Sequence, residues 1–269
     1  MKVVLFCGGL GLRLYPTTDN IPKPLVPVGG KPVILLLMKY YSYFGHKDFV
    51  LCLGYKGEEI KKFFLNYDEC PQDDFVLSNG VKKQLSKSEI QDWNITFAET
   101  GLNTNVGQRL KAVRKYLEGE EMFLANYSDA LTDLPLSKMI SYFAKRDKIA
   151  CLTAVKPAGF TFHYVSVNEG NVQSISPLNQ TSLRINGGFF AFKKQIFDFI
   201  NPGEDLVIEP FQRLIDKNEL IAYLHDGFWA SLDTYKDKQR LDELSSNNES
   251  FWEIWNGKSK NNLGEESDV

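Results

Sequence analysis

The sequence predicts an α/β fold, in which a Rossmann-like, mostly parallel sheet is flanked by helices and carries a smaller antiparallel insertion. Apolar runs of about four to six residues alternate with longer segments of helical period, a pattern typical of buried strands covered by helices. The chain of 269 residues is 43% hydrophobic and 24% charged, so it can bury a sizeable core. From about residue 159 the runs become shorter and alternate, which indicates the insertion.

The first half of the chain is predicted to consist of repeated strand and helix units. KVVLFC at 2–7 is the first expected strand because its apolar run is uninterrupted. Pro32 suits the first turn of a helix, and the periodic apolar stretch that it opens ends at Gly45. A polar segment at about 67–92 has little periodicity. The remaining expected elements are strands at 49–53, 94–98, 122–126 and 149–155, and helices at 57–65, 106–117 and 136–145.

The second half is predicted to contain the antiparallel insertion, with strands at 164–167 and 184–192, and then a helix at 235–244. Aromatic residues after this helix are expected to dock on the body: Phe251, Trp252 and Trp255. Residues 1–255 are therefore expected to form a single domain. The end of the chain, 256–269, is predicted to be disordered because it is strongly polar.

Composition excludes several classes of protein. A formal net charge of −3 argues against a nucleic-acid partner, because binding a phosphate backbone depends on an excess of Lys and Arg. The sequence has no secretory leader and no long apolar segment, which predicts a cytoplasmic protein without a membrane partner. Cys70 is expected to be exposed. The cysteines within apolar runs are expected to be reduced core thiols: Cys7, Cys52 and Cys151.

A glycine-rich loop follows the first expected strand, in the stretch FCGGLGLRL at 6–14. A dinucleotide-binding fingerprint would need a third glycine where Leu14 stands. The segment Gly29-Gly30-Lys31 is no Walker loop either, because Pro32 replaces the metal-binding hydroxyl residue. The remaining interpretations are a backbone cradle for a triphosphate, with cationic side chains nearby, or simply a tight turn.

The motifs GGLGLRL at 8–14, PKPL at 22–25 and GGKP at 29–32 resemble the opening of the sugar-1-phosphate nucleotidyltransferases. The resemblance is strongest to the glucose-1-phosphate cytidylyltransferases and covers nearly all of the chain except the tail. It continues through GYKGEEIKKFF at 54–64, WNITFAETG at 93–101, GQRLKAV at 107–113, YSDALTDL at 127–134, INGGFF at 185–190 and GFWASLDTYKDK at 227–238.

The resemblance implies a GT-A-like nucleotidyltransferase fold and a site made of matching residues. Residues 1–155 would form mainly the nucleotide-binding half and 156–255 mainly the acceptor-binding half. Catalytic roles fall to Arg13 and Lys23, and a metal role to Asp129 and Asp233. The acceptor-binding positions are Asn186 and Gly187. The nucleotide-binding positions are Phe6, Cys7, Gly8, Gly9, Leu10, Gly11, Leu12, Thr104, Arg109 and Ser128.

The implied reaction transfers a cytidylyl group from CTP to a phosphorylated acceptor such as a sugar 1-phosphate, with release of pyrophosphate. It would supply an activated precursor for surface polysaccharide synthesis, and the resemblance is also consistent with a homo-oligomer. Because the acceptor phosphate is already an anionic nucleophile, no protein base is needed. Mg²⁺ suits two carboxylates that leave room for substrate oxygens. Taken singly, Asp129 and Asp233 could equally cap helices or turns, and Asp133 is expected to be such a cap.

The chain departs from the family pattern at several positions. Leu12 replaces a threonine, Ser128 and Ala130 replace glycines, and Ser176-Pro177-Leu178 replaces the usual E-K-P phrase. The lost lysine should cost about 1.5 to 3 kcal/mol of phosphate affinity unless another cation compensates. The two candidates for that cation are Arg184 and Lys156. The acceptor could therefore be a different or non-sugar phosphate, and the alternative is a nucleotide-binding regulatory or scaffold protein that has lost acceptor chemistry.

Overall fold

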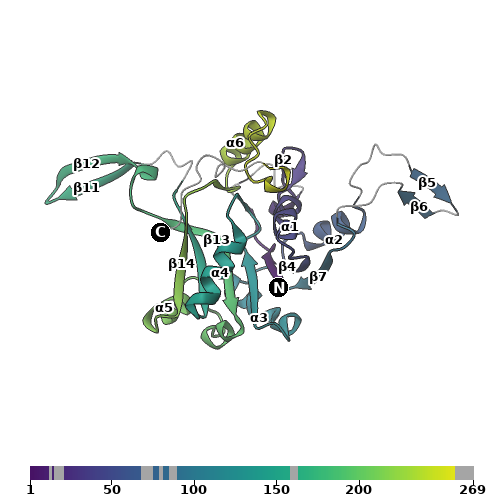
Figure 1. Cartoon of the computed structure of the whole chain (residues 1–269), viewed down its shortest axis with the longest axis horizontal. Helices are drawn as coiled ribbons and strands as arrows, with labels where there is room; N and C mark the ends of the chain where they lie inside the picture. The colour runs from purple at the N-terminus through teal and green to yellow at the C-terminus, as the bar shows by residue number, and fades with distance from the viewer. Residues whose placement is uncertain are drawn as a thin grey trace.

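A seven-stranded sheet lies at the centre of the protein, in the order β14-β10-β13-β8-β1-β4-β7 (Figure 1). The computed structural model describes residues 1–11, 14, 21–67, 75–78, 81–84, 90–157 and 163–257. The sheet strands are β1 (Val3–Phe6), β4 (Asp48–Leu53), β7 (Asn94–Glu99), β8 (Met122–Asn126), β10 (Ala150–Val155), β13 (Ile185–Lys193) and β14 (Leu220–His225). All neighbours except those of β13 pair in parallel, as the sequence predicts.

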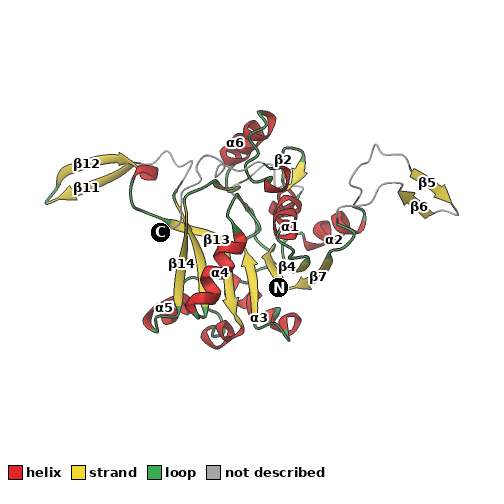
Figure 2. Cartoon of the chain, viewed as in Figure 1, coloured by secondary structure: helices red, strands yellow, loops and turns green. Residues whose placement is uncertain are grey.

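Helices cover the two faces of this sheet (Figure 2). Successive residues of a strand point to opposite faces, so Leu5 packs with α1 and α4 while Val4 packs with α3 and α5. The resulting three layers confirm the predicted α/β fold. The helices are α1 (Val33–Tyr43), α2 (Gly57–Leu65), α3 (Val106–Ala112), α4 (Leu136–Arg146), α5 (Glu209–Asp216) and α6 (Tyr235–Ser246).

Three local predictions need correction. The segment predicted at 184–192 is not part of the insertion: β13 lies in the central sheet, antiparallel to β8 and β10, and Gly187 to Phe192 are buried. The helix predicted at 106–117 ends at Ala112, and a 3-10 turn, η3 (Arg114–Leu117), completes the segment. Pro32 ends a short strand, and the helix begins one residue later.

Four small two-stranded sheets surround the core, and one of them is the expected antiparallel insertion. It is the hairpin of β11 (His163–Asn168) and β12 (Asn171–Pro177), which projects from the body in Figure 1. The others pair β9 (Ala130–Thr132) with β15 (Trp229–Ser231), β2 (Pro27–Val28) with β3 (Lys31–Pro32), and β5 (Phe75–Ser78) with β6 (Val81–Gln84). The remaining 3-10 turns are η2 (Lys23–Leu25), η4 (Leu178–Gln180), η5 (Lys194–Phe199) and η6 (Ile254–Asn256).

The C-terminal aromatics dock as predicted. Trp252 is buried, with its ring centroid 5.6 Å from that of Phe228. Asn256 belongs to η6 and is therefore ordered, whereas 258–269 of the predicted tail lie outside the described residues. The cysteines expected in the core are buried free thiols, and Cys70 lies outside the described residues. Among the helices that the structure describes, none combines the length and apolarity that crossing a bilayer requires.

Candidate functional site

The loops that leave β1 and β8 meet at one edge of the sheet and enclose a cavity of about 410 Å³. Because β1, β4, β7 and β8 run parallel, their carboxyl ends share this edge, where parallel α/β sheets bind their ligands. β10 and β14 end there too, since β10 and β8 are both antiparallel to β13. The cavity is lined by Phe6, Cys7, Gly9, Leu10, Gly11, Lys23, Pro24, Tyr127, Ser128, Asp129 and Asp233.

Three charged side chains from distant parts of the chain meet in this cavity. The Nζ atom of Lys23 donates to Oδ2 of Asp129 at 2.6 Å and to Oδ1 of Asp233 at 2.8 Å. Lys23 opens η2, Asp129 joins β8 to β9, and Asp233 follows β15. A backbone bond of 2.7 Å from the nitrogen of Leu232 to the oxygen of Asp129 fixes the two aspartate segments side by side.

Neither Asp129 nor Asp233 is the N-cap of a helix that the structure describes. Thr234, not Asp233, is the N-cap of α6, in a capping box with Asp237. Asp129 precedes a strand rather than a helix. Asp133 was expected to be a cap and is not: its Oδ1 atom accepts a hydrogen bond of 2.7 Å from the backbone nitrogen of Phe228. The carboxylates of Asp129 and Asp233 therefore pair with Lys23 in the cavity and are not helix caps.

Electrostatics hold Lys23 in its charged form. Burial opposes the charge, but the carboxylates of Asp129 and Asp233 outweigh it, so the pKa of Lys23 is raised. One ammonium between two carboxylates leaves the trio with a net negative charge, which favours binding of a further cation. No cluster of three or more His, Cys, Asp or Glu side chains forms a metal site in the described ranges. A pair of carboxylates that leaves room for waters and phosphate oxygens fits Mg²⁺ better than zinc.

Arg109 supports the glycine loop from behind. Its guanidinium donates to the backbone oxygens of Gly8 and Leu53, each at 3.1 Å, and to Oγ1 of Thr100 at 2.7 Å. A Cβ atom on Gly8 would lie 2.1 Å from Arg109 Nη1, so a larger residue there would force the guanidinium out of its hydrogen bonds. In this structure Arg109 is buried and does not line the cavity. The nucleotide contact implied for Arg109 stays a prediction.

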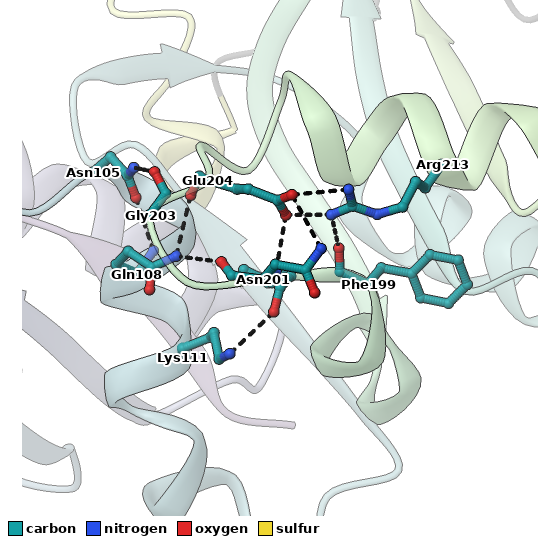
Figure 3. Close-up of polar contacts among 9 residues, drawn as sticks. Asn105, Gln108, Lys111, Phe199, Asn201, Gly203, Glu204 and Arg213 are labelled. Atoms are coloured by element: carbon teal, nitrogen blue, oxygen red, sulfur yellow. Dashed lines mark hydrogen bonds and ion pairs between the residues drawn. The ribbon is translucent and has the colours of Figure 1, made fainter.

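Helix α3, which carries Arg109, is fastened to the loop before α5 (Figure 3). Asn105 Nδ2 donates to the oxygen of Gly203 and Gln108 Nε2 to that of Asn201, both at 2.8 Å. Glu204 braces the loop through an ion pair with Arg213, whose hydrogen bond lowers the pKa of Glu204 to about 2. The position of Arg109 therefore depends on this network.

Ser128 keeps a backbone conformation that favours glycine. Its φ of 62° lies in the left-handed region, where the family pattern has glycine. The hydroxyl donates to the oxygen of Phe6 at 2.7 Å, and the backbone nitrogen donates to Oδ1 of Asn126 at 2.7 Å. Ser128 thus ties the loop after β8 to the end of β1. Burial raises the pKa of the neighbouring Cys7 thiol to about 12, so Cys7 stays a neutral part of the wall.

The remaining predicted site residues occupy different places. Leu12 and Arg13 lie outside the described residues. Thr104 is half-buried just before α3 and does not line the cavity. Among residues that the sequence did not single out, Tyr127 lines the cavity. The sequence feature that could have identified Tyr127 is its position directly after a buried strand and beside Ser128.

The predicted acceptor residues lie on β13, next to the cavity rather than in its wall. Asn186 Nδ2 donates to the hydroxyl of Tyr127 at 3.3 Å, and Gly187 accepts a 2.8 Å bond from the indole of Trp229. Farther along the same edge, Arg184 pairs with Asp226 at 2.8 Å, and Lys156 lies 3.4 Å from the same carboxylate oxygen. Arg184 and Lys156, the two cations named as substitutes for the missing lysine, therefore lie together at the carboxyl edge, and their role toward an acceptor stays a prediction.

Comparison with known proteins assigns the family. The model of a family described as nucleotidyl transferase matches residues 2–240. The chain belongs to this family.

The nucleotidyltransferase is 37% identical over 258 residues to the glucose-1-phosphate cytidylyltransferase of Salmonella typhimurium, covering 95% of this chain and 100% of that protein. It is 35% identical over 257 residues to a Bacillus subtilis protein named "Probable glucose-1-phosphate cytidylyltransferase", with the same coverage. The inositol-1-phosphate CTP transferase from T. maritima has a similar fold, with a TM-score of 0.62 at 19% identity, over 91% of this chain and 94% of that one.

Proposed function

We propose that this nucleotidyltransferase transfers a cytidylyl group from CTP to a phosphorylated acceptor, with Mg²⁺ as cofactor and pyrophosphate as the second product. The acceptor is a sugar 1-phosphate such as glucose 1-phosphate, or a modified or non-sugar phosphate. The observation that supports the proposal most directly is that Lys23 pairs with Asp129 and Asp233 in the cavity that the glycine loop lines. The identity to cytidylyltransferases supports the choice of base.

In the proposed reaction an oxygen of the acceptor phosphate attacks the α-phosphorus of CTP. The bond from the α-phosphorus to the bridging oxygen breaks, and pyrophosphate leaves with the electron pair. The chain's residues bind and orient: the backbone from Phe6 to Gly11 cradles the nucleotide, and Lys23 supplies positive charge beside it. Asp129 and Asp233 would hold Mg²⁺, which neutralises phosphate charge when bound. Arg13 is proposed to stabilise the leaving group.

The test is an assay of pyrophosphate release with each of four nucleoside triphosphates against a panel of phosphorylated acceptors, with Mg²⁺ present. We expect turnover with CTP and at least one sugar 1-phosphate. Background rates for every pairing would refute the enzymatic proposal. The departures Leu12, Ser128 and Ser176-Pro177-Leu178 favour a second candidate, a nucleotide-binding regulatory or scaffold protein. Calorimetry that detects tight CTP binding without turnover would support that candidate.

The proposal extends to the cellular role and the assembly. We propose that the enzyme acts in the cytoplasm, possesses no nucleic-acid or membrane partner, and supplies a nucleotide-activated precursor for surface polysaccharides. We also propose that it forms a homo-oligomer. Sedimentation of the purified protein tests the oligomer, and fractionation of the producing cells tests the compartment. A monomer at micromolar concentration, or recovery in the membrane fraction, would contradict these two points.

A further inference from the structure

Four residues beyond Asp129, the chain contains a buried polar corner formed by Asp133, His225 and Phe228. Asp133 Oδ1 lies 3.0 Å from His225 Nε2 and accepts from the backbone nitrogen of Phe228 at 2.7 Å. The oxygen of Phe228 lies 3.2 Å from the same His225 nitrogen. Because both oxygens are acceptors, Nε2 carries the hydrogen. The exposed fractions of the His225 and Asp133 side chains are 4% and 0%, so neither reaches the substrate.

The corner lies at one end of a ribbon whose other end carries the two aspartates. Strands β9 and β15 pair over three residues each, from Trp229 opposite Thr132 to Ser231 opposite Ala130. Beyond Ser231, the nitrogen of Leu232 bonds to the oxygen of Asp129. At roughly 3.3 Å per residue, the corner lies about 13 Å from Asp129. The same short ribbon therefore connects the corner to the aspartates.

A ribbon of this length has little stability of its own, and a slip of one residue would turn each side chain to the opposite face. The corner fixes the register with two further hydrogen bonds and one steric requirement. Asp133 donates its backbone nitrogen to the oxygen of Phe228 at 3.2 Å, and Thr132 donates its hydroxyl to that oxygen at 2.7 Å. Gly227 adds a steric requirement, since a Cβ atom there would lie 2.4 Å from Asp133 Oδ1.

We infer that Asp133 and His225 are positioning residues that set the spacing of Asp129 and Asp233, and thereby the metal dependence of nucleotide binding. The inference rests on the proposed function only in that Asp129 and Asp233 are taken as the metal-binding pair. Asp129 precedes β9 and Asp233 follows β15, and the corner is one of the features that fix the register of these two strands. A shift at the corner moves one aspartate relative to the other.

The experiment compares CTP binding by calorimetry in Mg²⁺ and in EDTA, for the wild type and Asp133→Ala. The ratio of the two Kd values measures the coupling between metal and nucleotide. We expect Asp133→Ala to lower this ratio about tenfold, which corresponds to about 1.4 kcal/mol of coupling, while Kd in EDTA stays unchanged. Asp133→Asn, which retains an oxygen acceptor for Phe228, should recover most of the coupling.

Ser42→Ala is the matched control, because it removes a 3.0 Å bond to Trp93 Nε1 elsewhere in the core and should leave the ratio unchanged. If Asp133→Ala does not fold, Thr132→Val carries the same test at nearly constant shape, because it removes the hydroxyl that donates to the oxygen of Phe228 and accepts from the nitrogen of Leu134. An unchanged ratio in the folded variant overturns the inference. A wild type that binds CTP equally with and without Mg²⁺ instead contradicts the proposed metal role, so the two failures are distinguishable.

Discussion

Ser128 allows a quantitative test of how this chain replaces a glycine of the family pattern. Its left-handed backbone costs about 1 to 2 kcal/mol for a residue with a Cβ atom, and its buried hydroxyl bonds to the oxygen of Phe6 at 2.7 Å. Ser128→Ala keeps the backbone cost and leaves that oxygen unpaired, so we expect the free energy of unfolding to fall by about 2 kcal/mol. Ser128→Gly loses the same bond but relieves the backbone, so we expect a fall of about 1 kcal/mol.

Urea unfolding followed by tryptophan fluorescence measures both values, provided that the variants keep the m value of the wild type, which is the slope of the free energy of unfolding against urea concentration. Ala130→Gly is the matched control, because Ala130 replaces the other glycine of the pattern but does not have a positive φ. Glycine in the short strand β9 should therefore destabilise by roughly 0.5 to 1 kcal/mol. These expectations are contradicted if Ser128→Ala has the same free energy of unfolding as the wild type, or if Ser128→Gly is less stable than Ser128→Ala.

The remaining predictions concern the charged centre, the glycine loop and acid stability. Asp129→Asn should lower kcat/KM at least about 100-fold with an unchanged circular dichroism spectrum, and retained turnover would contradict the metal role. Gly8→Ala places a methyl group against Arg109 and should destabilise the protein by about 1 to 3 kcal/mol, measured by urea unfolding; an unaltered midpoint would refute the tight contact. The lowered pKa of Glu204, about 2 against the ordinary 4.5, contributes stability that is present above about pH 4.5 and lost as the pH falls toward 2. Glu204→Gln should flatten that part of the acid-unfolding profile, and an identical profile would count against the Arg213 ion pair.

This chain departs from the family pattern at the acceptor phrase but not at the charged centre. Lys23, Asp129 and Asp233 follow the family pattern, whereas the E-K-P phrase is replaced at 176–178. Ser176 and Pro177 end β12, in the hairpin that projects from the body. Arg184, one of the two cations that could replace the lost lysine, is already paired with Asp226. An acceptor phosphate that binds Arg184 would have to compete with that carboxylate. The panel of acceptors in the pyrophosphate assay therefore tests which phosphorylated compounds can do so.

The sequence determined most of the larger elements and their order, whereas α5, β14 and the short strands β9 and β15 were not predicted. Strand and helix periodicity depends on about ten consecutive residues, so the bounds of β4, α2, β8 and α4 could be predicted to within about one residue. The glycine loop and the motifs after it also determined the family, because they lie in continuous stretches. Buried strands could be recognised from their apolar runs alone, since both faces are covered by helices.

Only the tertiary structure decided which segments meet. The sequence does not state that β13 inserts between β8 and β10, because an apolar run fits a central strand and an insertion equally well. It could not show that Arg109 turns to the back of the glycine loop, or that Asp133 pairs with His225 instead of capping a helix. These outcomes depend on strand register and packing between residues about 90 to 100 positions apart. Local propensity carries no information about such distances, so the fold decided them.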